Sequence, residues 1–280
     1  MVVSSADGRL AKGGALVITR GLHSAEEFYS RRIADAQTLL SAAKQHAADG
    51  DAVGALAAAV GADMATLQAL LWERINMAPR APQRQLFQAA EALAEVMGLF
   101  GDDEAAGRAS AADLVVAART RMAEALDDSL AAEAASRWPS VDFLGGFAAP
   151  SASDLDASVR QRTNGLSVSE YIVDRRASAG RMMLDAQSSR VRGATSEAIR
   201  CAYESDFLSL EAYLAESAWL LGDAWLLTAI SRWDLVTSAV GDLARLPDGF
   251  VDAVTLVRRT MTEALGDADG ARLDEVFEPI

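Results

Sequence analysis

Three groups of polar side chains interrupt apolar, helix-forming segments, and their residue types suit the binding of a divalent metal ion and a phosphate. The first group is the acidic run Asp102, Asp103 and Glu104, which follows an apolar stretch ending at Phe100. Carboxylates are unfavourable at the negative end of a helix dipole, so a divalent cation held by oxygen ligands would offset their charge. The alternative is an ordinary solvated acidic turn.

The second group consists of Asp234, Ser238 and Asp242, spaced four residues apart. On a helix this spacing places the three side chains on one face. Three oxygen ligands along two turns could hold one Mg²⁺, with water and substrate oxygens completing its coordination. A solvent-exposed acidic face is the competing interpretation.

The third group is an arginine pair, Arg175 and Arg176, followed one turn later by Gly180. Arginine is well shaped for bidentate contact with phosphate oxygens. A glycine inside a helix costs about 1 kcal/mol relative to alanine, so Gly180 indicates a helix break or a close backbone approach. A surface arginine pair beside a tolerated glycine would look the same in the sequence.

The elements that must position these groups are helices, because the Val/Ile/Thr alternation typical of half-buried strands is almost absent. Two capping boxes mark helix starts, Ser24 with Glu27 and Ser167 with Glu170. The sequence therefore predicts an all-α, single-domain helical bundle. The predicted helices are 24–48, 52–60, 63–77, 82–100, 110–136, 152–163, 168–187, 195–204, 207–231, 233–245, 249–265 and 271–277.

The predicted domain covers residues 23–280, preceded by a flexible N-terminal segment, 1–22. Residues 138–153 form the only long connection rich in helix breakers, and we interpret it as a loop rather than a domain boundary. No unit of 20 to 50 residues recurs, which argues against a helical solenoid.

Charge and composition exclude several classes of protein. The net charge of −14 and pI of about 4.6 disfavour binding to nucleic acids and anionic membranes. Cys201 is the single cysteine, and His23 and His46 are the only histidines, so a divalent metal would have to be bound by carboxylates. With no signal-peptide pattern and no uninterrupted apolar span, we expect a cytoplasmic protein without stable membrane insertion. A homodimer is compatible with these features.

Taken in order, the three groups resemble the motifs of bacterial class I terpene synthases. Asp102 and Asp103 look like the start of that family's aspartate-rich motif, and Asp234, Ser238 and Asp242 occupy the ligand positions of its second metal motif. The run from Leu166 to Gly180 is similar to the helix between the two motifs. The resemblance covers about residues 85–265, and it implies the all-α class I terpenoid synthase fold.

The resemblance also implies a reaction, in which Mg²⁺ ions and Arg176 draw the diphosphate from a linear prenyl diphosphate and the resulting carbocation cyclises to a terpene. Such a lyase needs positive charge at one end of a dry apolar cavity. By this resemblance the implied metal ligands are Asp102, Asp103, Asp234, Ser238 and Asp242. The catalytic positions are Arg176, Ala179 and Gly180, and the substrate-binding residues are Arg175, Arg176, Phe87, Phe100 and Trp225.

Some positions depart from the family pattern. Ala106 stands where the first motif usually ends in an acid, and Leu235 replaces the second aspartate of the later motif. No Arg-Tyr pair, which in that family contributes to diphosphate binding, occurs near the end of the chain, where Arg258 and Arg259 would have to take its place. These departures are those of a divergent or inactive member.

Two other classes of function remain open. One is a non-catalytic all-α interaction or regulatory module in which the three polar groups are accidental. The other is a DNA-binding regulator, because Gly165 to Leu184 also resembles a helix of AraC-type regulators. The lack of a basic face around that segment counts against DNA binding. A chain-elongating prenyltransferase would need two aspartate-rich motifs.

Overall fold

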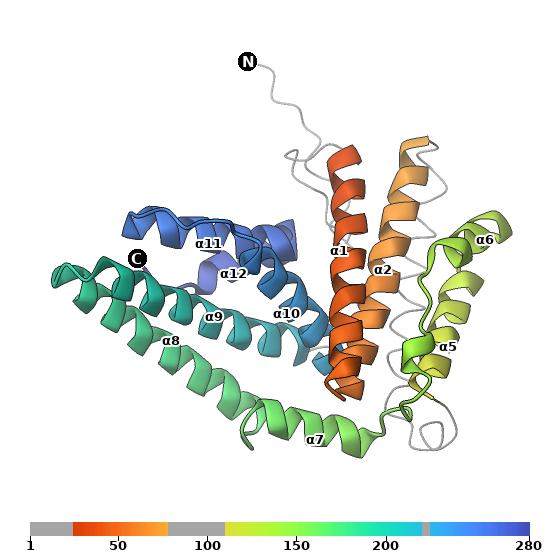
Figure 1. The fold of residues 1–280 in the computed structure, drawn as a ribbon, viewed down its shortest axis with the longest axis horizontal. Helices are drawn as coiled ribbons and strands as arrows, with labels where there is room; N and C mark the ends of the chain where they lie inside the picture. Colours follow the sequence, from red (N-terminus) through yellow and green to blue (C-terminus); the bar gives the residue numbers. More distant parts are fainter. Residues whose placement is uncertain (1–24, 78–109, 220–224) are drawn as a thin grey trace.

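The computed structural model describes residues 25–77, 110–219 and 225–280 (Figure 1). Within these residues the secondary structure is helical, and the only β-type pairing is an isolated bridge between Ser110 and Ala148. The predicted all-α class is therefore confirmed. The helices are α1 (Ala25–Ala48), α2 (Ala52–Met77), α5 (Ala111–Glu124), α6 (Asp128–Arg137), a 3₁₀ turn (Asp142–Leu144), α7 (Ala152–Arg162), α8 (Val168–Val191), α9 (Thr195–Trp219), α10 (Trp225–Gly241), α11 (Phe250–Leu265) and α12 (Asp267–Val276).

Four predicted helix boundaries are wrong, one of them the break expected at Arg232, through which α10 runs continuously; the other three have a clear local reason. Helix α2 runs through Gly61 without a break, because this glycine lies against Ser231 of α10, where an added Cβ would come within 3.0 Å of the hydroxyl oxygen. Helix α9 continues through Ser205 and Asp206, whose polar groups are satisfied by tertiary partners. The predicted helix 110–136 is divided, because Asp127 caps α6 by accepting a 3.0 Å hydrogen bond from the amide of Leu130.

The order and lengths of the helices show that the chain contains the same unit twice. Helices α1, α2, α5 and α6 have 24, 26, 14 and 10 residues, and α8, α9, α11 and α12 have 24, 25, 16 and 10. We call residues 24–140 the first repeat and residues 167–279 the second repeat. In Figure 1 they form two arms, and α7 lies between them in the chain.

The sequences of the two repeats align over their long helical hairpins without a gap. Positions in α1 and α2 correspond to those 143 residues later in α8 and α9, and the shared residues include the Ser24–Glu27 and Ser167–Glu170 pairs. Gly50 and Gly193 end the first helix of each hairpin with φ of 79° and 76°, a conformation that favours glycine. The following amides donate to equivalent carbonyls, Asp51 to His46 at 2.8 Å and Ala194 to Ser189 at 2.9 Å. The chain therefore contains an internal duplication.

A buried ion pair fixes the first repeat. Arg119 of α5 donates hydrogen bonds of 2.7 and 2.8 Å to the carboxylate of Asp63, which is fully buried in α2. It also donates to the carbonyl of Pro139 at 2.7 Å and stacks on the ring of Trp138. Burial raises the pKa of Asp63 to about 6, and the hydrogen bonds from Arg119 oppose that rise.

The second repeat contains the same arrangement at the equivalent positions. Arg258 of α11 donates to Asp206 of α9 at 2.7 and 3.0 Å, to the carbonyl of Glu278 at 2.7 Å, and stacks on Phe277. Burial raises the pKa of Asp206 to about 6 as well, against the hydrogen bonds from Arg258. In each repeat one guanidinium group thus ties together α2 or α9, α5 or α11, and the segment that follows the last helix.

Helix α10 joins the cores of the two repeats. Leu226 and Ile230, near its N-terminus, belong to the core built mainly from α2 and α5. Val236 and Val240, two to three turns later, pack in the core of α9, α11 and α12. Within the described residues, α10 of the second repeat therefore packs into the cores of both repeats.

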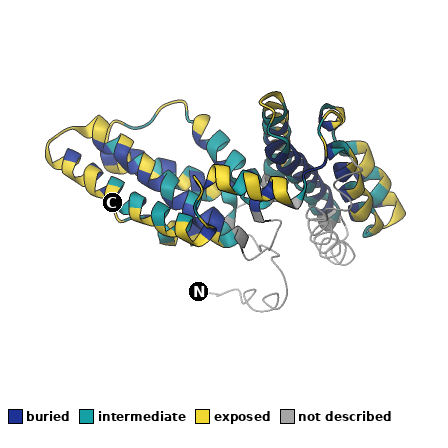
Figure 2. Cartoon of the chain, turned by 90° about the horizontal axis from the view of Figure 1, so that it is seen from below, coloured by how far each residue is buried: buried dark blue, intermediate teal, exposed yellow. Residues whose placement is uncertain are grey.

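Among the described residues, one helix is long and apolar enough to span a membrane, the segment 52–74 of α2. Of its most apolar window, 83% is buried inside the protein (Figure 2). Such burial is typical of the core helix of a folded domain.

Candidate ligand cavity between the repeats

A cavity of about 340 Å³ lies where the two repeats meet. Its wall combines an apolar side, formed by α9 and α10, with a polar side contributed by α1, the end of α7, α8, α9 and α10. The apolar residues are Leu214, Ala215, Leu226, Ala229, Ile230 and Trp233, and the polar residues are His46, Arg162, Thr163, Tyr171, Glu211 and Asp234. Its size is at the lower end of the range for small-molecule sites, about 300 to 1,000 Å³.

His46 lies at the centre of a charged network at the polar side of the cavity. Its Nε2 is 3.1 Å from a carboxylate oxygen of Asp234, and its Nδ1 is 3.0 Å from a carboxylate oxygen of Asp51. The hydrogen bonds to Asp234 and Asp51 raise the pKa of His46 to about 9, so the imidazole is protonated at neutral pH. Arg162 extends the network by donating to Asp51 at 2.7 Å.

Asp51 holds this network at the start of α2. Burial favours its neutral form, but hydrogen bonds from His46 and from the amide of Gly54, together with the charge of Arg162, lower its pKa well below the usual range. A Cβ at position 54 would lie 2.3 Å from the Asp51 carboxylate and 2.5 Å from Nδ1 of His46. Glycine at position 54 therefore leaves room for the ion pair.

A second polar group faces the cavity from α8 and α9. The hydroxyl of Tyr171 donates to Glu211 at 2.9 Å, and Arg175 lies 3.4 Å from the same carboxylate and 2.8 Å from Asp174. Burial and the neighbouring Glu211 raise the pKa of Tyr171, which keeps its hydroxyl protonated. At the equivalent place in the first repeat, Arg32 donates to Gln68 at 3.4 Å.

The charges that line the cavity are balanced by one another. Asp51 and Asp234 alternate with His46 and Arg162, and Glu211 is contacted by Arg175. An ionic group on a ligand would have to compete for these partly exposed side chains, because each of them already has a partner of opposite charge. The cavity therefore favours an uncharged ligand with a polar head and an apolar body.

The predicted second metal motif is only partly brought to this cavity. Asp234 lines it, but its carboxylate is paired with His46. Ser238 lies one turn further along α10, and Asp242 is exposed just beyond the end of the helix. Within the described part of the chain, no three His, Cys, Asp or Glu side chains are grouped so that they could hold a metal ion. The Mg²⁺ site stays a prediction.

The resemblance implies that Arg176 acts on the diphosphate, which requires its side chain to face the cavity. Arg176, expected to face the cavity, is half exposed and forms an ion pair with Glu216, whereas its neighbour Arg175 contacts the cavity residue Glu211. One helical step of about 100° separates the two side chains. Helix α8 also continues through Gly180, and the carbonyl of Ala179 accepts a 2.9 Å hydrogen bond from Ser205 of α9 instead of facing a substrate.

The remaining predicted site residues are not among the described residues that line the cavity. Asp102, Asp103, Phe87 and Phe100 lie outside the described residues. Trp225 is the first residue of α10.

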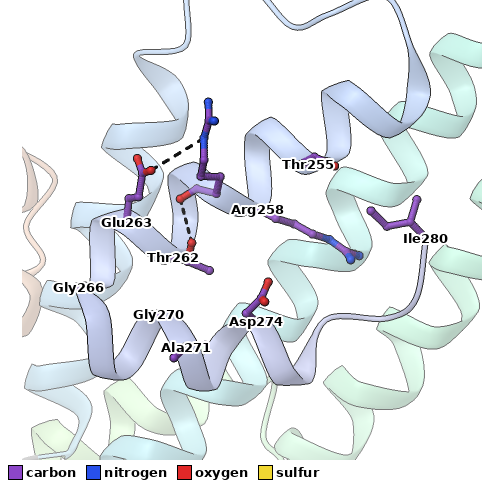
Figure 3. A pocket seen from close by; sticks show the side chains of 10 residues that line it. Thr255, Arg258, Thr262, Glu263, Gly266, Gly270, Ala271, Asp274 and Ile280 are labelled. Atoms are coloured by element: carbon purple, nitrogen blue, oxygen red, sulfur yellow. Dashed lines mark hydrogen bonds and ion pairs between the residues drawn. The ribbon is translucent and has the colours of Figure 1, made fainter. Parts of the chain in front are cut away.

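A second pocket, of about 450 Å³, lies between α11, α12 and the C-terminus (Figure 3). Its two arginines are the pair that the sequence offered for diphosphate binding. Arg258 is committed to Asp206, and Arg259 is 3.9 Å from Glu263. This pocket is a polar surface hollow between packed helices.

Sequence reasoning missed His46, Arg162 and Glu211. One signal was present for His46, a lone histidine near the C-terminal end of a small-residue helix and five residues before the acid Asp51. The positions of Arg162 and Glu211 depend on how the two repeats meet, which no local pattern shows. Comparison of the chain with protein-family models, with curated proteins and with solved structures gives no significant match.

Proposed function

We propose that this chain is a non-catalytic regulatory module that binds a small, uncharged amphipathic molecule in the cavity between its repeats. The observation that carries the proposal is the pairing of an apolar wall with a charge-balanced polar side. A ligand there would touch α1 of the first repeat and α8, α9 and α10 of the second. Binding would stabilise one relative orientation of the two repeats, which is the basis of ligand-controlled regulation.

The internal duplication bears on the alternative, a terpene synthase. Part of the segment that resembles the family recurs in the first repeat, where Ser24, Glu27 and Arg32 stand at the positions of Ser167, Glu170 and Arg175. Because both repeats carry these three residues, the helical hairpin that the repeats have in common is enough to explain them. The residues that are not shared, Arg176 and Gly180, point away from the cavity or lie in an unbroken helix.

One observation still favours Mg²⁺-dependent ionisation of a prenyl diphosphate as a second candidate function. Asp234, from the second metal motif, and Tyr171, from the run that resembles the helix between the two motifs, line the same cavity beside its apolar wall. In that case Mg²⁺ would have to replace His46 as the partner of Asp234.

Calorimetric titration with geraniol and with geranyl diphosphate, each with and without Mg²⁺, separates the two candidates. The regulatory proposal predicts that geraniol binds without Mg²⁺, that geranyl diphosphate binds more weakly, and that gas chromatography detects no hydrocarbon product. Tight Mg²⁺-dependent binding of geranyl diphosphate with product formation would establish the second candidate instead. If neither compound binds, the cavity is not a site for a C10 alcohol, and ionisation of geranyl diphosphate is wrong as well.

A matched pair of variants tests whether geraniol binds in this cavity. Ala229→Phe fills the cavity and is expected to weaken geraniol binding by at least about tenfold, the equivalent of 1.4 kcal/mol. Ala244→Phe introduces the same side chain at an exposed position shortly after α10 and is expected to bind geraniol as the wild type does. Equal affinities of the two variants would place the ligand elsewhere.

A further inference from the structure

The outer face of α8 carries an apolar stripe that the packing of the chain leaves uncovered. Val173, Leu184 and Val191 are 68%, 63% and 89% exposed. At about 100° per residue they lie within about 20° of one another around the helix, and they span about 27 Å along it. Figure 1 shows α8 along the outer edge of its arm, with α9 packed against its other side. We call these three residues the α8 stripe.

The first repeat provides an internal control for this face. Helix α1 occupies the same place in its repeat and is exposed at the equivalent positions, where it carries Ser30, Ser41 and Ala48. The fold thus does not need large apolar side chains there. Because isolated exposed apolar residues are common but an aligned set is not, the change to Val, Leu and Val indicates a surface that is covered in the assembled protein.

Charged residues along one edge of the α8 stripe identify the partner. Asp174, Arg181, Asp185 and Arg192 lie on the same edge, in the order minus, plus, minus, plus. In an antiparallel pair of helices, residues on the same edge of the two stripes face each other. With a two-fold axis near Met183, Asp174 would face Arg192 of a second copy, and Arg181 would face Asp185.

The apolar positions fit the same arrangement. An axis near Met182 places Val173 opposite Val191 and Leu184 opposite Gly180, within one residue of the axis that the charges require. Gly180 has no side chain to oppose Leu184, and an added Cβ there would have only Glu278 within 4 Å, at 3.6 Å.

From the α8 stripe, the absence of such a stripe in α1 and the self-complementary charges, we propose that α8 is the interface of an antiparallel homodimer of this chain. A two-fold interface of this kind is self-complementary, as required for a closed dimer.

Sedimentation equilibrium of the full chain over a range of concentrations tests the proposal. The wild type is expected to change from monomer to dimer as its concentration rises. The triple variant Val173→Ser, Leu184→Ser, Val191→Ala carries the residues that α1 tolerates at the same positions, and its dimerisation should weaken by at least about tenfold. Circular dichroism and urea unfolding verify that the variant is folded. A monomeric wild type, or a variant that dimerises as well as the wild type, would overturn the proposal.

A charge swap tests the antiparallel orientation. Asp185→Arg alone places two arginines opposite each other and should weaken the dimer, whereas Arg181→Asp together with Asp185→Arg should restore it. A parallel pair of helices would bring each position close to its own copy, so Asp185→Arg would only replace one like-charge contact with another, and neither variant would differ much from the wild type. Failure of the rescue would overturn the antiparallel arrangement.

Discussion

His46 is held between two carboxylates, and this makes part of the stability dependent on pH. Its pKa is about 9 in the folded chain, against about 6.5 when unfolded, because Asp234 and Asp51 favour the protonated ring. The contribution of the protonated His46 to the free energy of unfolding is fully present below about pH 6.5. It is lost as the pH rises through about 9, because the imidazole of the folded chain then loses its proton.

We therefore expect urea unfolding to show a loss of about 2 kcal/mol between pH 6 and pH 9.5, after allowance for solvent screening. In His46→Gln the same pH change should have a much smaller effect. A wild type and a variant with parallel pH profiles would show that the imidazolium does not stabilise the fold.

The two buried aspartates should respond equally to mutation, because each is bound by one arginine in the same way. Asp63→Asn and Asp206→Asn each leave a buried guanidinium without its counter-charge, and the expected loss is about 3 to 5 kcal/mol in urea unfolding. Asp248→Asn removes the partner of Arg245 in an exposed pair and should cost less than about 1 kcal/mol. A small effect at either buried site would contradict the role assigned to that pair.

At the scale of helices, the close approach of α12 to α11 depends on Gly270. A Cβ there would lie 2.3 Å from the backbone carbonyl oxygen of Thr262, which cannot move aside as a side chain can (Figure 3). Gly270→Ala is therefore expected to cost about 1 to 3 kcal/mol in thermal or urea unfolding, although alanine is the better helix former. Gly146→Ala, with open space around its Cβ, is the control and should unfold almost as the wild type does. If Gly270→Ala were as stable as Gly146→Ala, α11 and α12 could move apart without a loss of stability.

The sequence was informative where helices begin and less so where they continue. The capping box at Ser167 correctly predicted the start of α8, and its geometry is present in the structure. The interior of α9 was misjudged because Ser205 and Asp206 look like a break when their partners, Ala179 and Arg258, are not known. Local patterns report capping, whereas a buried polar residue is explained only by the helix that packs against it.

At the scale of the whole molecule, the sequence predicted the fold class and one residue of the cavity, Asp234. The duplication has no short-period signature in the sequence, because the matching residues lie 139 to 143 positions apart. Aligning the two capping boxes, at Ser24 and Ser167, would have shown it. The cavity could not be predicted in the same way, because it forms between repeats and the spacing of residues within one repeat says nothing about that junction.

Because α10 contributes to both cores, the two repeats should unfold together. Ile230→Ala removes a buried side chain from the core of α2 and α5, and Val236→Ala does the same in the core of α9 and α11. Each should cost about 1 to 4 kcal/mol and shift the circular dichroism and tryptophan fluorescence transitions by the same amount. Two separate transitions, with each variant shifting only one, would show that α10 does not couple the repeats.

The shared helix also determines when the first repeat can complete its fold during synthesis. Its core includes Leu226 and Ile230, which leave the ribosome long after α1, α2, α5 and α6 have been made. Until then, the side of α2 that receives α10 at Gly61 and Ala57 is exposed to water and available to other nascent chains. The N-terminal half of the protein is thus synthesised first, but its core is completed late. A chain that stops before α10 would expose an aggregation-prone apolar surface of the kind that chaperones bind.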